Sequence, residues 1–147
     1  AYYRLVFLDG SAADLGDLHL DLTAFWFGIS ATRGVDLSEP PFREHEAQIS
    51  SPTRYAAAQR LGAEMRGAGV QACLYVSARA EGRRLNVAVF ENVFGPGRPL
   101  REEPWSCIAN RSGAEFRARN LLGPERRQAF ARAQFEVAGR LPAPALG

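Results

Sequence analysis

Ser77 is the residue of this chain best placed to do chemistry, because it follows an apolar run and opens a polar loop. Residues 70–76 and 85–90, on either side of the loop, have the composition of strands. A hydroxyl there can bind a ribose or a phosphate, but it becomes a nucleophile only beside a base. His19 and His45 lie in no local context that points to Ser77, and a Gly-x-Ser-x-Gly motif is absent around it. A Ser-His-Asp hydrolase is therefore disfavoured, and spacing alone favours Ser77 as the cap of a turn.

Arg79 and Asn86 are the other polar residues of this segment that could reach a ligand. If the strand pleat continues past Ser77, the side chains of Ser77 and Arg79 point to the same face. The Arg79 guanidinium could then clamp a pyrophosphate with two hydrogen bonds; the alternative is a solvated Arg at a strand end. Asn86 either faces the same loop or bonds its own backbone. Arg79 and Asn86 are accordingly our predicted binding residues, with both alternatives open.

A helix should lead into the first of these strands. Ser51 offers an N-cap, Pro52 the favoured first helical position, and Gly69 the left-handed position after the last turn. Apolar side chains recur at helical spacing between these ends, at Ala58, Leu61, Met65 and Ala68. One helix face against two strand faces predicts a core that includes Leu61, Met65, Cys73, Tyr75, Val87 and Val89.

The other elements are predicted from local composition and turn residues. We expect strands at residues 2–8 and 19–23, a surface loop over 33–51, a hairpin from 105–110 and 114–119, and a helix over 124–138 followed by a Pro-rich tail. The aromatic cluster at residues 25–27 is interpreted as core, or as a cover over the core, rather than as a base-stacking platform, because no basic residue interleaves it.

Composition limits the class of protein and its partners. A chain of 147 residues with 46% hydrophobic residues can bury a core. All 18 basic residues are Arg, but the net charge is only +2 and no long basic run occurs, so nucleic-acid binding is not indicated. No apolar stretch approaches the length of a membrane span. Two His and two Cys without useful spacing predict no metal site.

The two cysteines leave one question open and favour a cellular compartment. Cys73 lies in an apolar run and is interpreted as a small buried hydrophobic residue. A disulfide between Cys73 and Cys107 stays open at this stage. Two cysteines in a domain of this size suit the cytoplasm better than a secreted scaffold.

Several motifs in a fixed order point to a known family. The order is Tyr2-Tyr3-Arg4, Leu20-Asp21-Leu22-Thr23, Tyr55-x-x-x-Gln59, Tyr75-x-Ser77-x-Arg79 and Asn86-x-x-x-Phe90. This order resembles the middle and end of the RES domain, a family named for an Arg, a Glu and a Ser. The resemblance covers about residues 1–117 and leaves 118–147 as a C-terminal helix and tail.

The resemblance implies a fold and a chemistry. The fold is α+β, with a small mixed or antiparallel sheet and flanking helices, similar to diphtheria-toxin-like ADP-ribosyltransferases. RES proteins are NAD-degrading toxins that cleave the nicotinamide–ribose bond, with phosphate, water or a protein as acceptor. By resemblance NAD is the substrate, Ser77 lines the nicotinamide-ribose pocket, and an Xre-type antitoxin is the partner.

The family's Arg and Glu find no match here, because Arg4, Arg33, Glu39 and Glu44 stand in no corresponding context. We therefore expect an N-terminally incomplete domain that turns over NAD slowly or not at all by itself, and that exposes apolar surface which favours homo-oligomers. One alternative is a noncatalytic remnant of a toxin–antitoxin pair that binds a partner. Another is a small-molecule binding module that matches the motifs by chance.

Overall fold

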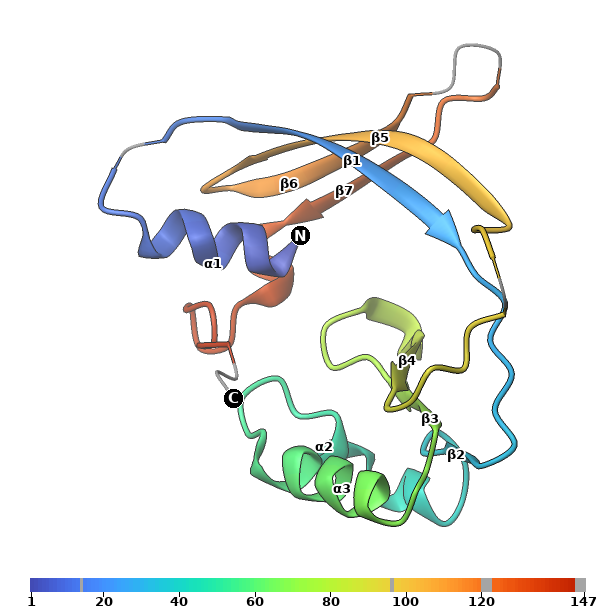
Figure 1. Cartoon of the computed structure of the whole chain (residues 1–147). Coiled ribbons are helices and arrows are strands. Elements are labelled where there is room, and N and C mark those ends of the chain that lie inside the picture. The colour runs from blue at the N-terminus through green and yellow to red at the C-terminus, as the bar shows by residue number, and fades with distance from the viewer. Residues whose placement is uncertain (14, 96, 120–122, 145–147) are drawn as a thin grey trace. The chain divides into compact units, whose positions relative to one another are not determined.

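The computed structural model describes residues 1–13, 15–95, 97–119 and 123–144, and the chain divides into two compact units (Figure 1). Residues 1–27 and 98–147 form the terminal unit, and residues 28–97 form the central unit. Each unit combines helices with a small sheet, antiparallel in the terminal unit and mixed in the central one. The predicted α+β class is confirmed.

The terminal unit is a four-stranded antiparallel sheet with a helix packed against it, and the strand order is β1-β5-β6-β7. The first and last parts of the chain meet here, because β1 pairs with β5 in a register that sets Leu18 opposite Ala109. The predicted hairpin is confirmed by β5 and β6. Its elements are α1 (Tyr2–Gly10), β1 (Leu18–Trp26), β5 (Arg101–Asn110), β6 (Gly113–Ala118), β7 (Arg127–Ala131) and η3 (Arg132–Phe135).

The strand predicted at residues 2–8 is wrong because this segment is the helix α1. Its aromatic and β-branched composition suggested a strand. Its burial, however, follows a helical period, since Tyr2, Leu5 and Leu8 are buried whereas Tyr3 is exposed. Packing of that stripe onto the sheet outweighs the local propensity of the residues.

The helix predicted over residues 124–138 is also wrong, since the segment forms β7 and the short helix η3. Phe130 and Ala133 have helical spacing, but β6 offers an antiparallel partner in which Ala114 stands opposite Phe130. Phe130 packs against Phe116 at 5.9 Å between ring centroids, and Phe135 joins the buried cluster with Leu5. Tertiary pairing decides the structure of this segment.

A buried carboxylate, Glu103, links β5 to the residue just before β7. Only 5% of Glu103 is exposed, and its oxygens accept hydrogen bonds from Arg101 (3.1 Å) and from the Trp105 indole (3.0 Å). Arg126 forms a further ion pair with it and lies over the Trp105 ring. Partners of opposite charge make this burial tolerable.

The central unit is a three-stranded mixed sheet of order β2-β3-β4, with its main helices between β2 and β3 along the chain. β2 runs parallel to β3, and β4 runs antiparallel to β3. The predicted loop over 33–51 holds three of the short elements. The elements are β2 (Gly34–Asp36), η1 (Phe42–His45), α2 (Glu46–Ile49), α3 (Ala56–Gly67), β3 (Ala72–Val76), η2 (Glu81–Arg83) and β4 (Leu85–Val89).

The helix α3 ends where the sequence predicts and begins later. Gly69 adopts the left-handed conformation (φ +72°) just after the C-cap Ala68, as expected. Ser51 does not cap the helix: its Oγ accepts the N–H of Arg54 at 3.1 Å, and the helix starts at Ala56. Ser51 instead closes a turn that precedes α3.

Cys73 belongs to the core as predicted, whereas Val87 and Val89 do not, since they are 45% and 36% exposed. The reason is the position of the strand in the sheet. β3 is the central strand, and Ala72, Cys73 and Val76 are buried on it, whereas Val87 and Val89 lie on β4, an edge strand of the same sheet. Leu61, Met65 and Tyr75 are half-buried. Cys73 and Cys107 are both buried free thiols, which answers the disulfide question.

Within the described residues, no helix has the length and apolar content that crossing a membrane requires.

Truncation of Leu5 should destabilise the terminal unit. Leu5 is fully buried, so Leu5→Ala should lower the free energy of unfolding by about 2–5 kcal/mol, the usual cost of a core cavity. Phe7→Ala is the matched control, because Phe7 lies on the same helix and is 56% exposed. Urea denaturation measures both. Equal effects of the two variants would mean that α1 packs through another face.

The terminal unit should also lose stability in acid. Arg132 donates hydrogen bonds to both carboxylate oxygens of Asp9, at 2.8 and 3.0 Å, and lowers the pKa of Asp9. A lowered folded-state pKa gives stability that is present above the unfolded pKa and is lost as the pH falls through the folded one. Urea denaturation of the parent and of Asp9→Asn should therefore differ at pH 6 and converge towards pH 2. A constant difference would contradict the ion pair.

Candidate functional site

Ser77 lies directly after β3 and caps the turn that follows it. Its N–H donates to the carbonyl of Arg84 at 2.8 Å, which closes the loop between β3 and β4. Its Oγ accepts the N–H groups of Ala80 at 3.2 Å and Arg79 at 3.4 Å. The hydroxyl keeps one proton that it can donate to a ligand. The turn-capping interpretation is thus confirmed, and it leaves a further role possible.

Ser77 also lines a cavity, as predicted. The Ser77 side chain is half-buried, and the cavity has a volume of about 510 Å³. Its walls come from η1, α2, the end of β3 and η2, so four short elements of the central unit build it. The lining residues are Arg43, Glu44, Glu46, Ala47, Ser50, Val76, Ser77, Ala78 and Arg83. Two guanidinium groups, two carboxylates and two hydroxyls therefore surround one space.

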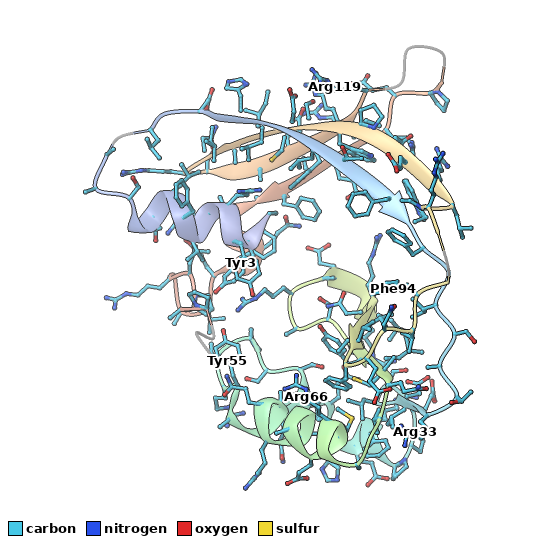
Figure 2. The ribbon with its side chains drawn as sticks, viewed as in Figure 1. Tyr3, Arg33, Tyr55, Arg66, Phe94 and Arg119 are labelled. Atoms are coloured by element: carbon cyan, nitrogen blue, oxygen red, sulfur yellow. The ribbon has the colours of Figure 1, made fainter. Side chains whose placement is uncertain are left out.

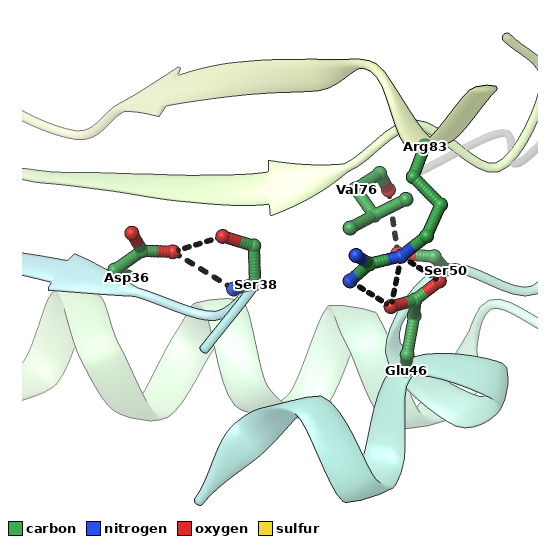
Figure 3. A network of polar contacts seen from close by, with 6 residues as sticks. All are labelled: Asp36, Ser38, Glu46, Ser50, Val76 and Arg83. Atoms are coloured by element: carbon green, nitrogen blue, oxygen red, sulfur yellow. Dashed lines mark hydrogen bonds and ion pairs between the residues drawn. The ribbon is translucent and has the colours of Figure 1, made fainter. Parts of the chain in front are cut away.

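An ion pair spans this cavity from α2 to η2 (Figure 3). The Arg83 guanidinium donates to Glu46 Oε2 from Nη2 at 2.7 Å and from Nε at 3.2 Å. The hydrogen bonds from Arg83 lower the pKa of Glu46, with a smaller contribution from the charge of Arg43. Glu46 raises the pKa of Arg83 in turn. Glu46 is therefore an anion at neutral pH and a poor proton acceptor.

The backbone holds both partners of this pair in place. Ser50 donates its hydroxyl to the carbonyl of Val76 at 2.6 Å, and its N–H to the carbonyl of Glu46, so α2 is fixed beside the end of β3 (Figure 3). On the other side, Gly82 and Arg83 have positive φ values of 71° and 51°. Arg rarely adopts this left-handed conformation, and here it points the guanidinium at α2.

The structure places Arg79 away from the cavity wall. The strand ends at Val76, so the pleat that would align residues 77 and 79 does not continue. Arg79 instead donates from Nη2 to the Tyr55 hydroxyl at 2.8 Å and to the Pro52 carbonyl at 3.1 Å. These contacts join the serine turn to the start of α3, where Tyr55 lies (Figure 2). Ligand binding by Arg79 stays a prediction.

Asn86 lies on β4, opposite Tyr75, and its side chain is exposed. It is not among the residues that line the Ser77 cavity. Its binding role also stays a prediction, and the structure does not bring it together with Ser77.

Sequence reasoning missed Arg43, Glu46 and Arg83 as residues of this site. Arg83 lies in a loop with several polar residues, and the sequence does not show which arginine of the loop faces the cavity. Gly82 was the available signal, because a glycine next to a positive-φ arginine permits a tight turn. Arg43 and Glu46 lie in a segment that we expected to be a surface loop.

Comparison with known families identifies the chain. Residues 1–107 match the family model of the RES domain. The chain belongs to the RES domain family. The match contains the whole central unit, with the serine loop and its cavity, and it reaches into β5 of the terminal unit. Comparison with curated proteins gives no match.

Within the described ranges, no three His, Cys, Asp or Glu side chains gather in a way that could hold a metal ion.

Removal of the Arg79 guanidinium should reveal whether its role is structural. Arg79→Met keeps the length of the side chain and loses the hydrogen bonds to Tyr55 and Pro52, so the free energy of unfolding should fall by about 1–3 kcal/mol. Arg84→Met removes an exposed neighbour and should change it by less than about 0.5 kcal/mol. Thermal denaturation distinguishes them. Equal stabilities would mean that these hydrogen bonds do not stabilise the fold and would favour ligand binding as the role of Arg79.

Proposed function

We propose that this RES domain protein is an NAD-consuming toxin that cleaves the bond between nicotinamide and ribose. The observation that carries the proposal is the position of Ser77, which we take as the family's serine from the resemblance of its motif, and which lines a cavity of about 510 Å³. A cavity of this size lies within the usual range of small-molecule binding sites. Ser77 is assigned to the nicotinamide-ribose end of the substrate.

The chemistry requires stabilisation of a ribosyl cation. As the glycosidic bond breaks, the bonding electron pair leaves with nicotinamide, and positive charge develops on the ribose. Phosphate, water or a protein side chain then forms the new bond to the ribose carbon and gives up a proton. A hydroxyl such as that of Ser77 orients the ribose, but a carboxylate stabilises the cation far better. Glu46 already accepts hydrogen bonds from Arg83. The sequence motifs assign no residue to the roles of the family's Arg and Glu.

The partner that we propose is an antitoxin protein, of the Xre type that pairs with RES toxins. A protein that consumes NAD would harm its own cell unless a partner blocked the site. The noncatalytic, partner-binding alternative draws support from β4, whose Leu85, Val87 and Val89 expose apolar side chains. Turnover of NAD decides between the two.

The decisive measurement is nicotinamide release from NAD. The 147-residue chain should release nicotinamide slowly or not at all, whereas a longer chain that adds an Arg and a Glu of the family's pattern should release it and arrest growth without the antitoxin. In such a longer chain, Ser77→Ala should lower turnover by roughly tenfold to a hundredfold, the effect of one hydrogen bond to a ligand. Ser30→Ala, an exposed serine of the central unit, is the control.

Two outcomes would change the proposal. Absence of turnover in the longer chain that carries the added Arg and Glu would exclude the enzyme and leave the partner-binding alternative. Full turnover by the 147 residues would mean that a catalytic carboxylate lies among them.

A further inference from the structure

The Ser77 cavity has a charge arrangement that the assigned role of Ser77 does not explain. Arg43 and Arg83 enter it from two different elements, η1 and η2. Arg83 is paired with Glu46, whereas no ion pair of the Arg43 side chain occurs among the described residues. The cavity is also lined by the carboxylate of Glu44. Because Arg43 has no ion pair among the described residues, its guanidinium is available to an anion that enters the cavity beside Arg83.

The ion pair in the cavity is easy to exchange. The side chains of Arg83 and Glu46 are 48% and 29% exposed, and ion pairs at such exposure contribute little to stability. A phosphate group presents several acceptor oxygens and a higher charge than a carboxylate, and guanidinium groups bind it with paired hydrogen bonds. An entering phosphate can therefore take Arg83 from Glu46 at small cost.

The backbone at Arg83 supports the same conclusion. Arg83 has a φ of 51°, a conformation that costs energy for a residue with a Cβ. Such strain persists where the surroundings hold it, and it often marks a ligand site. Here the hydrogen bond from Ser77 to the Arg84 carbonyl closes the loop and keeps the guanidinium over the cavity.

We propose that Arg43 and Arg83 form a binding site for a phosphate group beside Ser77, and that Glu46 is a built-in competitor that holds Arg83 until the ligand arrives. The inference rests on the proposed function, since it names the part of the substrate that this site takes. The phosphate comes either from the pyrophosphate of the dinucleotide or from free inorganic phosphate, and both share the chemistry that the site recognises.

Titration of the 147-residue chain tests the site without any turnover. Inorganic phosphate, ADP-ribose and uncharged adenosine are added separately, and the backbone amide and arginine side-chain NMR signals of residues 77–84 are followed. If the site binds free phosphate, inorganic phosphate and ADP-ribose should each shift these signals. If it binds only the pyrophosphate of the dinucleotide, ADP-ribose alone should shift them. Absence of shifts with both ligands, or equal shifts with adenosine, would overturn the proposal.

Variants of the ion pair should change affinity in opposite directions. Arg83→Gln should raise the dissociation constant of the bound anion by about tenfold or more, because one charge-assisted pair of hydrogen bonds is lost. Glu46→Gln should lower the dissociation constant by about threefold or more, because the carboxylate that competes for Arg83 is removed. Arg84→Gln removes an exposed neighbouring charge outside the cavity and should change it less than about twofold.

A purely structural ion pair gives a different result. In that case Arg83→Gln and Glu46→Gln would both weaken binding, or neither would change it, and the proposal would fall. Circular dichroism checks the fold, and if Arg83→Gln does not fold, the direction of the Glu46→Gln effect decides alone. No step of this test needs NAD cleavage. Phosphate binding without turnover in the longer chain described above would therefore exclude the enzyme and retain the phosphate site.

Discussion

The short antiparallel ladder between β3 and β4 is the constraint on which the candidate site depends. It pairs Val76 with Leu85, and the bond from Ser77 N–H to the Arg84 carbonyl continues it by one step. The residues between these points must then turn within a fixed span. That turn sets the serine at one edge of the cavity and the Arg83 guanidinium at another.

Local signals predicted the parts of the fold in which propensity and packing agree. The strands on both sides of the serine loop, the end of α3 at Gly69 and the hairpin around residues 111–112 each combine turn residues with suitable composition. In α1 the two signals disagree: aromatic residues favour a strand, but the spacing of Tyr2, Leu5 and Leu8 buries one helical face. In β7 a partner strand decides, and no local pattern contains that partner.

The sequence predicted the serine of the candidate site but not the charged residues around it. Motif order alone selected Ser77. The choice of Arg79 depended on the assumption that the strand pleat persists, and the strand stops before it. The error for Val87 and Val89 has another origin, because the sequence does not tell that β4 lies at the edge of its sheet. Orientation of side chains around a turn depends on a few backbone angles, and positive φ at a non-glycine residue is among the least predictable of them.

The way the terminal unit is assembled has a consequence for how the protein reaches its fold. β1 ends at residue 26, and its partner β5 begins at residue 101, so every hydrogen bond of that ladder closes a loop that contains the whole central unit. Such closures are entropically costly and slow the search for the native state. During synthesis β1 leaves the ribosome well before β5 exists, and for that interval it has no partner in its own sheet. If the central unit gains its structure first, the effective length of the loop shrinks, and the interval in which an unpaired strand is open to wrong partners shortens with it.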